Sequence, residues 1–91
     1  MTARIEKHGD SYVFRFHNAY RKTIRLNDDG TADMIVFHKG VTRPWVRPFS
    51  SFKEALNEIL HDDGRYITPA VIAQFRMEYG KFPLTKQRKK K

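Results

Sequence analysis

The chain has 91 residues, no cysteine and a formal net charge of +8 at pH 7. This length fits one small domain, because single domains run from roughly 50 to 200 residues. The lack of cysteine excludes a disulfide framework, a thiol nucleophile and a thiolate metal site. There is no apolar run near the roughly 18 residues of a membrane span, and no secretory signal begins the chain. We therefore expect a cytoplasmic protein with no membrane partner.

The positive charge is unevenly distributed. Residues 81–91 hold six basic residues and no acid, whereas residues 50–80 hold more acids than bases. A run of like charges is typical of a solvated segment that attracts polyanions. We predict a single domain over residues 1–80 and a basic, flexible, disordered C-terminal tail over residues 81–91. This tail either contacts phosphates or only aids solubility.

Period-2 patterns in the first half predict β-strands. The predicted strands are residues 3–7, 11–17, 22–26 and 31–38. Tyr12, Phe14 and Phe16 should share the core face of the sheet, because alternate residues of a strand point the same way. Ile24 and Leu26 should do the same. The continuous apolar run within residues 31–38 predicts a central strand that is buried on both faces.

The segment 41–49 contains two prolines, Pro44 and Pro48. Proline has no N–H for a central ladder and breaks a helix, so we expect an edge strand or an irregular arm here. If the segment is extended, Arg43, Trp45 and Arg47 lie on one face.

Two helices are predicted after this arm. Ser51 and Glu54 form a capping box, and one apolar stripe follows it at Phe52, Ala55, Leu56, Ile59 and Leu60. Thr68 and Pro69 predict the start of the second helix, and Gly80 predicts its end. Strands followed by helices indicate an α+β fold, an antiparallel meander of four or five short strands and then two helices. Two helices are too few to cover both faces, so one face of the sheet should be partly open.

Catalytic and metal-binding motifs are absent from the sequence. The four histidines are scattered, and there is no phosphate-binding glycine loop or nucleophile motif. We expect no enzyme activity, no cofactor, no metal and no small-molecule substrate.

Basic residues predict a surface for nucleic acid. Arginines on an open sheet face can form bidentate contacts with phosphates, together with further basic residues near the turns, Lys7, Arg21, Lys22 and Lys39. Trp45 would either stack on a base or close the sheet edge as a core residue. The predicted contacts are Arg15, Arg25, Arg43, Trp45, Arg47, Lys86, Arg88, Lys89 and Lys90. The acidic helix residues Glu54, Glu58, Asp62 and Asp63 form either a solvated face or a site for a basic protein.

Two resemblances extend this interpretation. The segments 12–16, 22–26 and 52–56 resemble the three-stranded-sheet-plus-helix DNA-binding domains of AP2 proteins and of some integrase N-terminal domains, over about residues 11–61. This resemblance implies a sheet in the major groove with arginines on DNA. As a short, basic, cysteine-free chain with a lysine tail, the protein is also similar to small phage-encoded accessory proteins, including anti-CRISPR proteins. That similarity implies an inhibitor in the host cytoplasm that blocks guide or target strand access.

We therefore predict a non-catalytic binder of nucleic acid, RNA or DNA, or of a host nucleoprotein complex, in which case a protein is also a partner. Two alternatives remain at this point. One is a stand-alone DNA-binding module of the AP2 or integrase-arm type. The other is a protein-binding adaptor whose charge only aids solubility.

Overall fold

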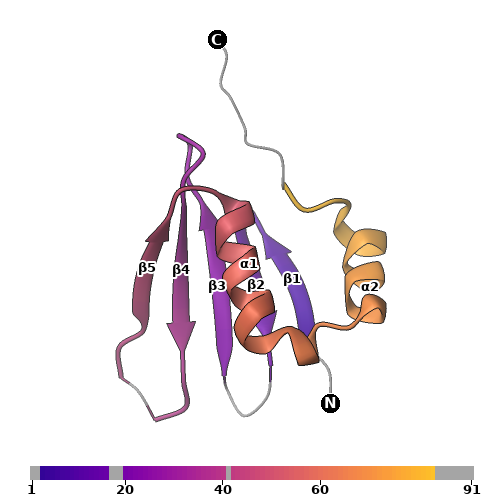
Figure 1. The fold of residues 1–91 in the computed structure, drawn as a ribbon, viewed down its shortest axis with the longest axis horizontal. Coiled ribbons are helices and arrows are strands. Elements are labelled where there is room, and N and C mark those ends of the chain that lie inside the picture. The colour runs from indigo at the N-terminus through magenta and orange to yellow at the C-terminus, as the bar shows by residue number, and fades with distance from the viewer. Residues whose placement is uncertain (1–2, 17–19, 41, 84–91) are drawn as a thin grey trace.

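The computed structural model describes residues 3–16, 20–40 and 42–83. Five strands come first: β1 (Arg4–His8), β2 (Ser11–Arg15), β3 (Arg21–Leu26), β4 (Ala32–Phe37) and β5 (Trp45–Phe49). They are followed by helix α1 (Phe52–Asp63), a 3-10 turn (Gly64–Tyr66) and helix α2 (Pro69–Tyr79). The strands pair antiparallel in the order β1-β2-β3-β4-β5, which confirms the predicted α+β meander (Figure 1). The predicted tail contacts Lys86, Arg88, Lys89 and Lys90 lie outside the described residues.

Helix α1 packs across one face of the sheet, against β3, β4 and β5 (Figure 1). Its first turn is capped as predicted, because the Ser51 hydroxyl accepts a hydrogen bond from the Glu54 amide at 3.2 Å. The Glu54 carboxylate reaches back to the amide of Ser50 at 3.3 Å. The buried side of α1 includes Phe52 and Ile59, which carry most of the predicted apolar stripe into the core. Leu60, the last predicted member of the stripe, is instead 40% exposed.

Helix α2 lies beside β1, at the opposite edge of the sheet from β5 (Figure 1). The Thr68 hydroxyl accepts a hydrogen bond from the Val71 amide at 3.3 Å and caps the helix. Gly80 ends it with a φ of 88°, a positive value that favours glycine. Both predicted boundaries of this helix are therefore confirmed.

Phe82 is part of the core although it lies within residues 81–91, the predicted tail. Its ring stacks on Phe75, with centroids 4.3 Å apart and planes at 7°, and only 8% of the residue is exposed. Phe82 therefore belongs to the folded unit and not to the predicted tail. Charge alone assigned Phe82 to the basic tail. The burial of its apolar ring against the end of α2 favours a place in the core instead.

The core lies between α1 and one face of the sheet. Tyr12 and Phe14 point into it, as predicted, and cross-strand pairing places Ile24 opposite both Tyr12 and Met34. Phe14 and Ile24 are fully buried. This face of the sheet supplies most of the apolar area that stabilises the fold.

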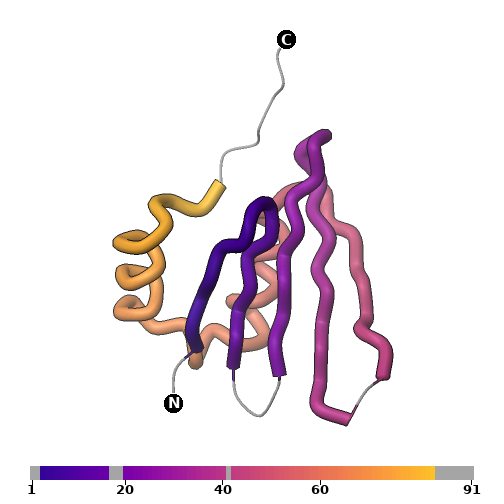
Figure 2. Tube along the Cα trace, turned by 180° about the vertical axis from the view of Figure 1, so that it is seen from behind, coloured from indigo at the N-terminus to yellow at the C-terminus, as the bar shows by residue number. Residues whose placement is uncertain are grey.

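Neither of the two described helices covers the other face of the sheet over β2 to β5, as seen from behind in Figure 2. This corrects the expectation that β4 is buried on both faces. Met34 and Val36 are buried under α1, whereas Ile35 and Phe37 are only half-buried. A continuous apolar run shows that both faces of a strand could be buried. Whether both are buried depends on how many helices pack on the sheet.

Strand β5 forms an edge of the sheet, as the prolines predict. Pro48 offers no N–H to a further strand, and most of β5 is exposed. Proline at an edge disfavours pairing with another sheet. Strand β5 can therefore expose its side chains to solvent without pairing edge to edge with another sheet.

Candidate nucleic-acid interface

Three arginines form a row across the uncovered face of the sheet. Arg4 on β1 lies opposite Arg15 on β2, and Arg15 lies opposite Arg21 on β3. We call these three residues the arginine row. Like charges directly opposite one another destabilise a sheet unless an anion compensates them. The row is therefore a feature that a bound anion would stabilise.

Glu6 compensates part of this charge from within the sheet. The Nε atoms of Arg4 and Arg15 each donate to its carboxylate at 3.1 Å, and His8 lies at the same distance. The hydrogen bond with His8, followed by that with Arg15, lowers the pKa of Glu6 to about 2. Within the described part of the chain, no hydrogen bond engages the terminal guanidinium nitrogens of Arg4 or Arg15. Those nitrogens can bind a phosphate.

Arg21 completes the row in a different way. Its guanidinium carbon lies 4.1 Å from the centroid of the Phe37 ring, which is a cation–π contact. This contact holds the guanidinium over the uncovered face without neutralising it. Among the residues that the structure describes, no acid pairs with Arg21, so it contributes a full positive charge to the row.

An apolar row crosses the same face next to the arginines. Val13, Thr23, Ile35 and Val46 lie opposite one another from β2 to β5. Val13 is buried, whereas Val46 is 57% exposed. The uncovered face thus combines guanidinium groups with a strip of apolar surface.

The predicted contact residues divide between the two faces of the sheet. Arg15 and Arg25 lie on the uncovered face, and Arg25 donates to Asp33 at 3.1 Å. Trp45 and Arg47 lie on the helix side, since they pair with the buried Val36 and Met34. The predicted residues therefore do not form one continuous surface.

Trp45 is 63% exposed, and this excludes the role of a core residue for it. Its ring meets His38 edge to face, with centroids 5.7 Å apart. Arg43 is exposed in the segment that leads into β5. Arg47, on the same face as Trp45, donates to Glu58 of α1 at 3.2 Å. Trp45 and Arg47 thus share one side of the edge strand, as the alternation predicts.

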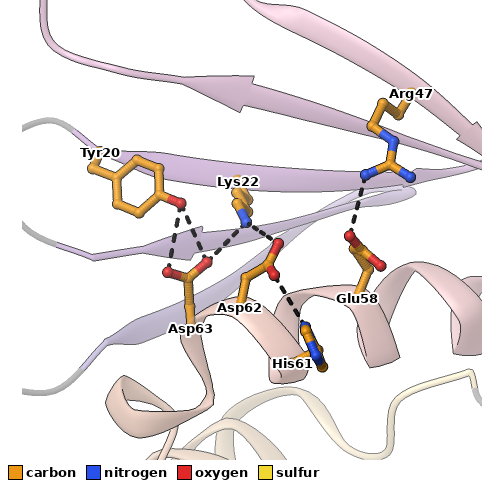
Figure 3. A network of polar contacts seen from close by, with 7 residues as sticks. All are labelled: Tyr20, Lys22, Arg47, Glu58, His61, Asp62 and Asp63. Carbon is orange, nitrogen blue, oxygen red and sulfur yellow. Dashed lines mark hydrogen bonds and ion pairs between the residues drawn. The ribbon is translucent and has the colours of Figure 1, made fainter.

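A buried ion pair joins β3 to the end of α1 (Figure 3). The Lys22 Nζ lies 2.8 Å from Asp63 and 3.6 Å from Asp62, and the Tyr20 hydroxyl donates to Asp63 at 3.2 Å. Burial disfavours the charged lysine, but the Asp63 carboxylate outweighs it and raises the pKa of Lys22 above its ordinary value.

The structure corrects the expectation that Lys22 is an exposed basic residue and that Asp63 belongs to an outer acidic surface of α1, although Glu54 and Asp62 are exposed. Lys22 is only 5% exposed, with Asp63 beside it, and Glu58 is turned towards Arg47. The strand pattern could have predicted the burial of Lys22. Lys22 and Ile24 are two residues apart on β3, so their side chains point to the same face of the sheet, which α1 covers. Glu58, Asp62 and Asp63 compensate cations of the sheet. Glu54 instead bonds to the amide of Ser50 at the start of the helix.

A cavity of about 260 Å³ lies between α1 and strands β3 to β5. Aromatic, apolar and charged side chains line it: Tyr20, Lys22, Met34, Val36, His38, Trp45, Arg47, Glu58 and Asp62. We call it the Trp45 cavity. Figure 3 shows the polar side of this region, where side chains from the sheet and from α1 point towards one another.

No family model, curated protein or solved structure matches this chain. Among residues 3–16, 20–40 and 42–83, no cluster of three or more histidine or acidic side chains could hold a metal ion. None of the helices described here combines the length and apolar character needed to cross a membrane.

Proposed function

We propose that this protein is a non-catalytic nucleic-acid binder whose uncovered sheet face contacts the phosphate backbone. The observation that supports this most directly is the arginine row. Strands lie about 4.8 Å apart, so the row places three guanidinium groups across roughly 10 Å of the surface. Guanidinium groups recognise phosphates in a bidentate manner, and a polyanion would relieve their mutual repulsion.

A protein-binding adaptor is the second candidate, and the apolar row favours it. Val46 and the half-buried Ile35 would suit the apolar side of a partner, with the arginine row beside it for acidic residues. The inhibitory role implied by the phage resemblance stays a prediction. A single set of variants tests the nucleic-acid proposal against the adaptor.

The test removes charge from the arginine row with Arg15→Gln and Arg21→Gln in one protein. The control protein carries Lys53→Gln and Arg76→Gln, which remove the same charge from exposed positions on the helices. Fluorescence anisotropy with labelled single strands and duplexes at several salt concentrations gives the affinities. We expect the row variant to bind at least 10-fold more weakly. The slope of its salt dependence should also be shallower by about 0.7–0.9 for each phosphate that the variant no longer binds.

Circular dichroism checks that both proteins are folded. Equal weakening in the row variant and the control would show that net charge alone drives binding, which contradicts the proposed interface. If the wild-type protein binds no nucleic acid at low salt, the proposal is wrong and the adaptor remains.

A further inference from the structure

The Trp45 cavity has a continuous aromatic wall. The Tyr20 ring stacks on His38 with centroids 4.6 Å apart, and His38 meets Trp45 edge to face. The apolar part of its lining comes from Met34 and Val36, which are both buried. A flat apolar group in this cavity would therefore contact aromatic rings and aliphatic side chains together.

The polar lining of the cavity is nearly neutral. Lys22 is compensated by Asp63 and Asp62, and Arg47 is compensated by Glu58. The carboxylates disfavour a phosphate inside the cavity, and the two cations disfavour a second cation. The lining nevertheless offers both hydrogen-bond donors and acceptors. A flat, uncharged, polar heterocycle matches this chemistry, and a nucleobase carries donors and acceptors along its edge.

We propose that the Trp45 cavity binds one unpaired nucleobase, which stacks on the exposed Trp45 ring. This rests on the proposed nucleic-acid binding and narrows the ligand to a single strand, because a base paired within a duplex cannot enter a cavity without being flipped out. Outside the cavity, the exposed Lys39 and Arg43 offer charges for the flanking phosphates. The strand passes over the edge at β5, where the two faces of the sheet meet.

The shape of the sheet also favours a single strand. Four intervals of about 4.8 Å make the five-stranded face roughly 19 Å wide, whereas the major groove is about 12 Å wide. The whole uncovered face therefore does not fit into a B-form groove. A flexible single strand can follow the arginine row and still reach the edge strand.

Trp45 is the only tryptophan in the chain, so its fluorescence reports directly on the cavity. The wild-type protein is titrated with a short single strand, an abasic strand with the same number of phosphates, and a duplex. We expect saturable quenching with the single strand and little quenching with the other two. Stacking of one base is worth roughly 1–3 kcal/mol, so Trp45→Ala should weaken single-strand binding by roughly 5- to 150-fold. It should leave duplex binding unchanged, and Trp45→Phe should retain most of the affinity.

Met77→Ala is the control, since Met77 is an exposed apolar residue on α2 that lines neither the Trp45 cavity nor the arginine row. It should keep the quenching. Equal single-strand affinity for Trp45→Ala and the wild type would overturn the inference, as would equal quenching by the abasic strand. Quenching by an arginine-rich peptide and not by the single strand would show a site for a protein cation instead.

The two proposals fail in different ways. If the arginine-row variant loses affinity and Trp45→Ala does not, the phosphate interface is supported and the base site is wrong. If Trp45→Ala loses affinity and the arginine-row variant does not, the base site is supported and the uncovered face is not the interface. If no strand binds, both proposals are wrong.

Discussion

Glu6 shows how one side chain sets the charge of the uncovered face. Its carboxylate bonds to Arg4, Arg15 and His8, so one acid holds three basic side chains in place. These contacts keep the pKa of Glu6 at about 2, below the ordinary value of 4.5. A carboxyl group whose pKa is lowered by folding stabilises the native state above its unfolded pKa and loses that contribution as the pH falls.

Glu6→Gln should make the protein less stable at pH 7, because the neutral amide loses the attraction to Arg4 and Arg15. The difference from the wild type should shrink as the pH falls from 4.5 to about 2, as the wild-type carboxyl becomes protonated. Urea denaturation at a series of pH values measures it. A difference that stays constant down to pH 2 would contradict the ion pairs.

At the scale of elements, the C-terminal end of α1 carries acidic residues that the helix's own sequence does not explain. Asp62 and Asp63 lie in its last turn, where negative charge opposes the helix dipole. The contact with Lys22 of β3 compensates this local conflict and ties the helix to the sheet. The two acids therefore contribute to the packing of α1, which an isolated helix would not reveal.

Lys22→Met should destabilise the protein by about 3–5 kcal/mol, because it leaves Asp63 buried without its cation. Adding Asp63→Leu should recover part of that loss, since both charges are then removed. Lys53→Met on the exposed side of α1 is the control and should change stability little. Denaturant unfolding measures all three variants. A loss under about 1 kcal/mol for Lys22→Met would show that the pair is not important for stability.

At the scale of the whole molecule, the charge is arranged by face. Helix α1 covers one side of the sheet and directs Glu58 and Asp63 towards it, whereas the arginine row lies on the uncovered side. The chain continues past α2 into the core, where Phe82 joins Phe75. The folded unit thus includes a short segment that follows the last helix.

Shortening the chain tests this segment. A protein that ends at residue 80 should lose about 3–5 kcal/mol relative to one that ends at residue 83, the cost typical of removing a buried phenylalanine. The longer protein is the control, since both lack the same five basic residues of 84–91. Thermal and denaturant unfolding give the comparison. Equal stability of the two proteins would show that Phe82 does not hold the fold together.

Much of the fold could be predicted because its signals are local. Each helix boundary is defined by a few neighbouring residues. These are Ser51 with Glu54 at the start of α1, Thr68 with Pro69 at the start of α2, and Gly80 at its end. The site was predicted only in part. The sequence left open whether Trp45 is a core residue or an exposed one, and the structure shows that it is exposed. The placement of Arg15 and Trp45 on opposite faces depends on the pairing register from β2 to β5, which no local pattern contains.

The sequence by itself determined the order of strands and helices, the caps, the edge character of β5 and the alternation that separates core from surface residues. The tertiary structure alone decided which sheet face α1 covers, and hence that Arg4, Arg15 and Arg21 form a row on the other. It also decided that Lys22 is buried with Asp63. The physical reason is that periodicity acts over neighbouring residues, whereas burial and charge pairing depend on distant segments meeting in space.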